Sequence, residues 1–161
     1  MPLAKTELIL FGTDSSFLEN LRGFSAELPY VRYKVGHGPE VVARAGLDAL
    51  WATPFAGVDL FGATPPFPLH EARVFETPPA QVRRGMPKYG VVGVATSEDD
   101  PKTPEYDLRL ALSALWRAVN DFNSRGNDRI VRVGILPDDL GLKKLDPADA
   151  FRIIREVYEQ V

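Results

Sequence analysis

Apolar residues along the chain gather in short runs, and longer stretches of mixed polarity separate the runs. Runs of valine, isoleucine, leucine and aromatic residues that end at a glycine, a proline or a polar turn are typical of β-strands. On this basis we predict strands at Leu8–Phe11, Val31–Val35, Leu47–Ala52, Ala72–Phe75, Tyr89–Ala95 and Ile130–Ile135. Because several of these runs are apolar at consecutive positions, we expect strands that are buried on both faces of a sheet.

Three stretches have apolar residues at helical spacing, and each is predicted to be a helix. The first is Phe17–Ala26. The second is a stripe whose apolar residues recur at steps of three and four, namely Leu108, Leu112, Leu115, Val119 and Phe122. Gly126 is predicted to end this helix. The last helix is predicted to begin at Asp146-Pro147, because aspartate caps a helix N-terminus and proline suits the first position.

The segment Thr53–His70 has four prolines, two glycines and little periodicity. We predict one long ordered loop there, with room for a short helical turn. Strands that alternate with helices predict a mixed or parallel sheet with helices on both of its faces. No repeat or linker divides the chain, so residues 1–161 are expected to form a single domain. Trp51 and Trp116 are predicted to lie in the core of this domain.

Composition and charge exclude several classes of function. The 161 residues carry a formal net charge of -3, and no long basic run indicates nucleic-acid binding. The chain has no cysteine, which excludes disulfides, thiolate metal sites and a cysteine nucleophile. No stretch approaches the ~20 apolar residues of a membrane span, and the first residues do not have a secretory-signal pattern. We therefore expect a cytoplasmic protein without a membrane segment.

Three parts of the chain, taken in order, form a recognisable pattern. They are Lys34–Gly36 followed by Leu47–Pro54, then Tyr89–Ala95 followed by the helix at Leu108–Phe122, and finally Arg129–Leu136 followed by Leu145–Ala150. This order resembles that of the macro domain, and Glu7–Phe24 is similar to the beginning of a macro-like subgroup. The resemblance implies a three-layer α/β/α domain with a mixed, largely parallel sheet of about six strands. It also implies binding of ADP-ribose or a related nucleotide in a cleft at the carboxyl ends of the strands.

The resemblance places the ligand contacts in three loops. The residues implied are Gly36, His37, Thr53, Gly57, Asp59, Pro137, Asp138 and Gly141. All three loops differ from the family's pattern, and the one that begins at Thr53 lacks the family's asparagine. His37 stands where the family has an aspartate for the adenine amino group, and Pro137–Leu142 replaces a glycine-rich turn whose N–H groups surround a diphosphate. Either the pocket is divergent and still binds a nucleotide, or the domain serves in protein interaction or assembly, including as a homo-oligomer.

Acidic residues in the same loops raise the alternative of catalysis. Asp59, or the adjacent pair Asp138 and Asp139, could act in a hydrolase of ADP-ribosyl or phosphoester groups. An adjacent aspartate pair is also an ordinary solvated turn, and the family's catalytic asparagine has no counterpart in this chain. No histidine or cysteine lies near the pair, so zinc is not expected. We therefore expect a binding module rather than an enzyme, without a metal or another cofactor.

The histidines and three of the phenylalanines each allow two interpretations of their role. His37 and His70 are the only histidines, and each is either a ligand or base or an ordinary surface residue. Phe55, Phe61 and Phe67 either stack on an adenine ring or form a hydrophobic lid over the core. The lid is the interpretation that we favour, because large aromatic side chains bury well.

Overall fold

The computed structural model describes residues 6–12, 19, 30–35, 46–95, 103–126, 128–136 and 144–160. The strands in these ranges are β1 (Glu7–Gly12), β2 (Val31–Val35), β3 (Ala49–Ala52), β4 (Ala72–Glu76), β5 (Tyr89–Gly93) and β6 (Arg132–Ile135). The helices are α3 (Pro54–Phe61), α4 (Pro79–Arg83), α5 (Pro104–Arg125) and α6 (Pro147–Gln160). Every predicted strand position therefore contains a strand, whereas the predicted helix Phe17–Ala26 lies outside the described ranges.

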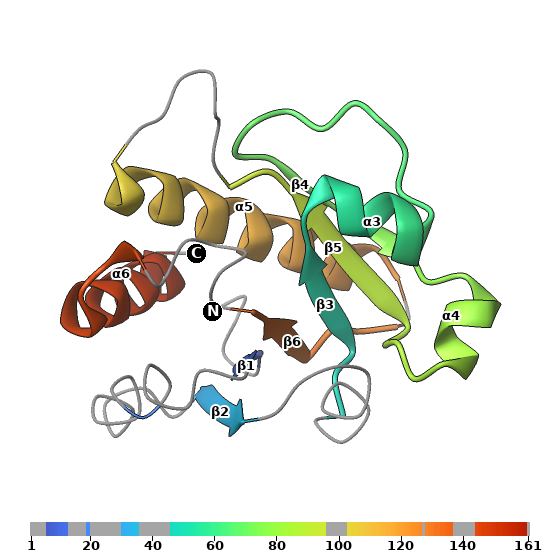
Figure 1. Cartoon of the computed structure of the whole chain (residues 1–161), viewed down its shortest axis with the longest axis horizontal. Helices are drawn as coiled ribbons and strands as arrows, with labels where there is room; N and C mark the ends of the chain where they lie inside the picture. Colours follow the sequence, from blue (N-terminus) through green and yellow to red (C-terminus); the bar gives the residue numbers. More distant parts are fainter. Residues whose placement is uncertain are drawn as a thin grey trace.

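The strands join one sheet in the order β2–β1–β6–β3–β5–β4 (Figure 1). β1 pairs in parallel with β2 and β6, and β3 pairs in parallel with β6 and β5. Among the strands in the described ranges, only β4, at the end of this order, is antiparallel to its neighbour β5. The chain is thus an α/β protein with a mixed sheet, as the alternation of elements predicted.

Alternate residues of the strands belong to two separate apolar clusters, one on each face of the sheet. On the first face, Trp51 packs with apolar residues of α5 and α6. On the other face, Leu50 packs with Phe61 of α3. Trp51 and Trp116 are both 1% exposed, which confirms their prediction as core residues. Both faces are buried here because α5 and α6 cover one and α3 the other (Figure 1).

The predicted end of α5 at Gly126 and the predicted start of α6 at Asp146-Pro147 are confirmed. The Thr103 hydroxyl accepts the Tyr106 N–H at 3.2 Å and caps α5, and Gly126 follows the last residue of that helix. Four of the five residues in the predicted stripe are buried, and Phe122 is partly buried against them. α6 begins at Pro147, and the Asp146 carbonyl accepts the Ala150 N–H at 2.9 Å.

The prediction of one long loop at Thr53–His70 is wrong for its first half. Pro54–Phe61 is a helix, α3, and Gly62 ends it in the left-handed conformation at φ 64°. The helix is too short to show several repeats of an apolar stripe, and proline at its first position is compatible with helical geometry. Its stability comes from tertiary packing, because Phe61 is 2% exposed against the second face of the sheet.

Candidate functional site

The parallel strands β1, β6, β3 and β5 bring their carboxyl ends to one edge of the sheet. From β3 the chain leads into α3, which packs on the second face. The helices that follow β5 and β6 in sequence, α5 and α6, pack on the first face. The chain therefore departs in opposite directions on either side of β3. In α/β sheets such a reversal opens a crevice, where ligands usually bind.

The N-terminus of α3 lies at this reversal. Thr53 directly precedes the helix, and its hydroxyl makes no capping hydrogen bond, while its carbonyl accepts the Gly57 N–H at 2.7 Å. The N–H groups of Phe55 and Ala56 precede that first helical bond, so they remain available to a ligand. Together with the positive end of the helix dipole, these groups favour an anion.

The three phenylalanines of the segment Thr53–His70 have different environments. Phe61 is buried, and Phe67 is partly buried against the same cluster, which agrees with the lid interpretation. Phe55, in contrast, is 91% exposed in the first turn of α3. The lid interpretation is therefore wrong for Phe55, because its position on the helix points it away from the sheet. An exposed aromatic ring beside free N–H groups is a platform on which a base could stack.

A histidine and an aspartate pair at the end of β5. His70 Nε2 lies 2.8 Å from Asp107 Oδ1, and the two side chains are 13% and 6% exposed. The backbone N–H of His70 donates to the backbone carbonyl of Val94 at 2.8 Å. The imidazole ring contacts Tyr106 edge-on, with 5.7 Å between the ring centroids. The interpretation of His70 as an ordinary surface residue is therefore wrong.

The His70–Asp107 pair has the geometry of an oriented imidazole. A carboxylate accepts hydrogen bonds, so in this contact the Nε2 side of the ring faces Asp107 and the contact fixes the orientation of the imidazole. His70 also has a φ of 60°, an unusual conformation for a residue other than glycine. Asp107 was not predicted as a partner of His70, which lies 37 positions away in the sequence. The one indication in the sequence is a carboxylate among the buried positions of α5.

The remaining predicted site residues are only partly covered by the structure. Gly36, His37, Pro137, Asp138, Asp139 and Gly141 lie outside the described residues. Thr53 lies at the reversal beside β3, and Asp59 is exposed on α3. Gly57 is buried in α3, where an added Cβ would come within 2.6 Å of the Val92 side chain. Packing of α3 on β5 therefore requires a glycine at this position.

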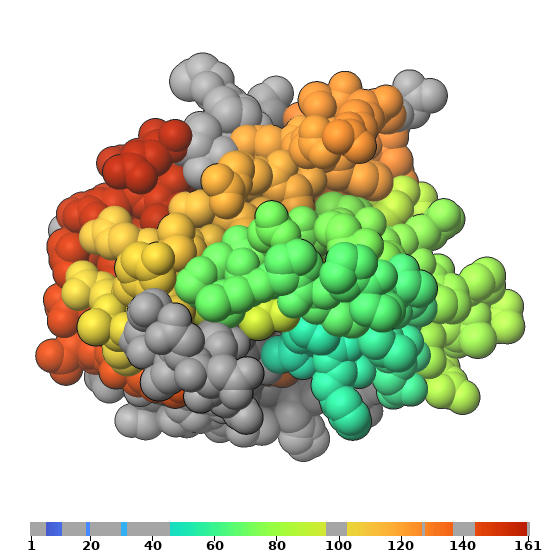
Figure 2. All heavy atoms as spheres, turned by 90° about the horizontal axis from the view of Figure 1, so that it is seen from above, coloured from blue at the N-terminus to red at the C-terminus, as the bar shows by residue number. Residues whose placement is uncertain are grey.

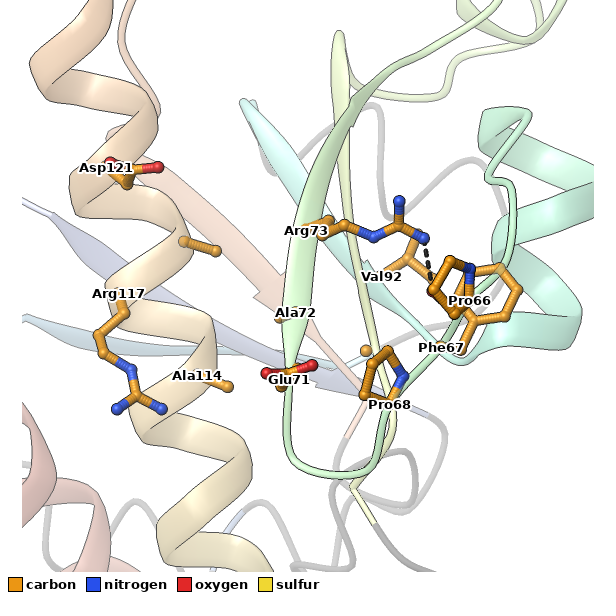
Figure 3. Close-up of a pocket in the computed structure, with 12 residues that line it drawn as sticks. Pro66, Phe67, Pro68, Glu71, Ala72, Arg73, Val92, Ala114, Arg117 and Asp121 are labelled. Carbon is orange, nitrogen blue, oxygen red and sulfur yellow. Dashed lines mark hydrogen bonds between the residues drawn. The ribbon is translucent and has the colours of Figure 1, made fainter.

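A second concave region runs beside β4. It is a hollow of about 760 Å³ with α5 on one side and Pro66–Pro68 on the other (Figure 3). Figure 2 shows the segment before β4, in green, lying alongside α5, in yellow to orange. Arg73 projects away from α5 and donates to the carbonyls of Thr64 and Pro66. Its guanidinium lies over the rings of Phe67 and Phe75, at 5.7 and 4.9 Å from their centroids.

Within the ranges described above, no group of three or more histidine, aspartate or glutamate side chains is arranged to hold a metal ion. None of the helices in those ranges is both long enough and apolar enough to cross a membrane.

Comparisons with models of known protein families, with curated proteins and with solved structures found no match to this chain. The carboxyl edge of the sheet and the hollow beside β4 are thus the two candidate sites among the described residues.

Proposed function

We propose that the chain is a divergent macro-type domain, with three α/β/α layers and about six strands, that binds ADP-ribose or a related nucleotide. The binding site is the crevice beside β3. One observation carries the proposal: a 91% exposed phenylalanine, Phe55, in the first turn of the helix that begins where the chain reverses. Exposure of a large aromatic side chain is costly unless a partner covers it.

The parts of a nucleotide match the groups at this edge. A phosphate suits the N–H groups at the N-terminus of α3, which carry a positive partial charge. A ribose or phosphate oxygen suits the Thr53 hydroxyl, which makes no hydrogen bond to its own helix. The adenine ring suits Phe55, because a base and an aromatic side chain gain energy by stacking.

Titration calorimetry with ADP-ribose tests this proposal directly. Phe55→Ala should weaken binding by about 1–3 kcal/mol, which is on the order of a 5- to 150-fold rise in Kd. Phe55→Trp should keep the affinity, because the indole ring also stacks. Neither change should alter thermal stability, since the side chain is exposed.

Val58→Ala is the matched control, because Val58 is 51% exposed on the same helix and lies beyond its first turn. It should leave the affinity unchanged. In a thermal-shift assay, ADP-ribose at 100 times its Kd should stabilise the fold by about 2.7 kcal/mol. Absence of any shift at millimolar ADP-ribose would contradict the proposal, and equal affinities of Phe55→Ala and the unaltered chain would move the site elsewhere.

A further inference from the structure

Among the described strands, β4 has one paired edge and one unpaired edge. The Thr77 N–H donates to the Lys88 carbonyl at 2.8 Å, and the β4–β5 register continues from this pair. In an antiparallel ladder every second residue bonds to the neighbouring strand, so Phe75 and Arg73 bond to β5. The N–H and C=O groups of the residues between them then point away from the sheet. These residues are Ala72, Val74 and Glu76.

The unpaired edge lies open to an incoming strand. β4 ends the sheet order among the described strands. Ala72 lines the 760 Å³ hollow, and Ala72 and Val74 line a second hollow of about 390 Å³ that shares several residues with it. In Figure 3, β4 runs between α5 and the Pro66–Pro68 segment, with free space beside it. An unpaired strand edge binds another strand through its backbone groups.

We propose that β4 pairs antiparallel with β4 of a second copy of this chain, about a two-fold axis through Val74. The proposal is independent of nucleotide binding, because β4 is the edge strand of the sheet and the proposed nucleotide crevice flanks β3. The axis places Val74 opposite Val74 of the second copy, and the outward groups of Ala72 opposite those of Glu76. Such a two-fold contact is closed, so it ends at a dimer.

Side chains on one face of the new ladder are complementary in this register. Arg73 stands opposite Phe75 of the second copy. Within one chain the Arg73 guanidinium already lies 4.9 Å from the Phe75 centroid, so this ring attracts an arginine. A shift of the axis to Arg73 would oppose two arginines, which is unfavourable. The register about Val74 is therefore the preferred one.

Charged side chains on the other face of the new ladder also favour a second copy of this chain as the partner. Glu76 stands opposite Ala72 of the second copy, and Ala72 lines the same hollow as Arg117. Arg117 is exposed and has no ion-pair partner among the described residues, while Asp121 beside it pairs with Arg125 at 2.7 Å. Glu76 is also exposed, and no ion pair of the described residues involves it. Glu76 of one copy thus supplies the carboxylate for Arg117 of the other, twice per dimer.

Sedimentation equilibrium on the full chain tests the proposal, and a dimer is the expected species. Val74→Pro should abolish it, because proline removes an outward N–H and leaves the bonds to β5 in place. Arg117→Glu should raise the dimer dissociation constant by about tenfold, since two surface ion pairs are lost. Glu76→Arg combined with Arg117→Glu should restore the dimer.

Arg83→Glu on α4 is the matched control, because Arg83 is exposed and lies outside both hollows. It makes the same charge change and should leave the dimer intact. Circular dichroism should confirm that each variant folds. A monomer at millimolar concentration of the unaltered chain overturns the proposal. A dimer that persists in Val74→Pro also overturns it. The same holds if the double variant Glu76→Arg and Arg117→Glu stays as weakly associated as Arg117→Glu alone.

Discussion

Gly90 lies directly under the ring of Phe61, and an added Cβ would come within 2.3 Å of that ring. Gly57 plays the reciprocal part on α3, where an added Cβ would come within 2.6 Å of Val92. Real Cβ atoms do not approach other atoms this closely, so both positions require glycine. At the scale of single residues, two missing side chains let α3 pack on the sheet and hold its N-terminus at the candidate site.

Gly90→Ala should destabilise the fold by about 1–3 kcal/mol, because the methyl group forces the Phe61 ring out of its place. Urea denaturation measures the free energy of unfolding. Gly126→Ala is the control, since the nearest atom to its added Cβ is 4.0 Å away and its φ of -138° is ordinary extended backbone. Equal stabilities of the two variants would contradict this account of α3 packing.

At the scale of elements, polar side chains fasten the C-terminal end of α5 to the sheet. Asn123 bonds both backbone groups of Ile130, at 2.7 and 3.0 Å. Asp128, after the helix, accepts the Tyr89 hydroxyl at 2.5 Å and the Lys88 ammonium at 3.2 Å. The hydrogen bond to Asp128, followed by burial, raises the pKa of Tyr89 from 10.0 to about 12. These hydrogen bonds therefore join α5 and β5 to the segment that leads into β6.

The raised pKa of Tyr89 gives a stability that depends on alkaline pH. The neutral phenol is favoured in the folded state, so its contribution is complete below pH 10.0 and disappears as the pH rises through about 12. Asp128→Ala should return the Tyr89 pKa toward 10.0, as measured by NMR titration of labelled tyrosine. Tyr30 is the internal control, because burial is the main cause that raises its pKa to about 12. A lowered Tyr30 pKa in this variant would indicate a wider structural change instead.

At the scale of the whole molecule, the sheet has a short junction at its centre. Two residues of β3 are in register with β6, compared with four that are in register with β5. Asp48 extends this junction, because its carboxylate accepts the N–H groups of Val131 and Arg132, both at 2.9 Å. Its own N–H donates to the Arg132 carbonyl at 2.9 Å. Asp48 thus ties the β2–β1–β6 half of the sheet to the β3–β5–β4 half.

Asp48→Ala should lower the free energy of unfolding by about 1–3 kcal/mol, since two hydrogen bonds to a charged acceptor are lost. Asp48→Asn should cost less, because one acceptor oxygen remains. Thermal unfolding followed by circular dichroism gives both values. Asp59→Ala is the control, because Asp59 is exposed on α3 and takes part in none of the hydrogen bonds of this junction. A stability unchanged in Asp48→Ala would show that the junction holds without the carboxylate.

Prediction from sequence succeeded where the pattern is local. The stripe from Leu108 to Phe122 repeats over several turns, and proline after Asp146 marks a helix start, so α5 and α6 were predicted. α3 was missed because eight residues are too few to show a period. The pairing of His70 with Asp107 was also missed, since no local pattern links residues that lie 37 positions apart.

The sequence by itself determined the α/β class, the positions of the strands and the core roles of Trp51 and Trp116, because burial periodicity and turn residues act over short distances. The resemblance also implies Thr53 as a site residue, which stays a prediction. Only the tertiary structure decided the order of the strands and the reversal beside β3. It alone exposed Phe55, paired His70 with Asp107 and placed β4 at the end of the order of the described strands. These features depend on contacts between distant segments, which no local pattern of residues specifies.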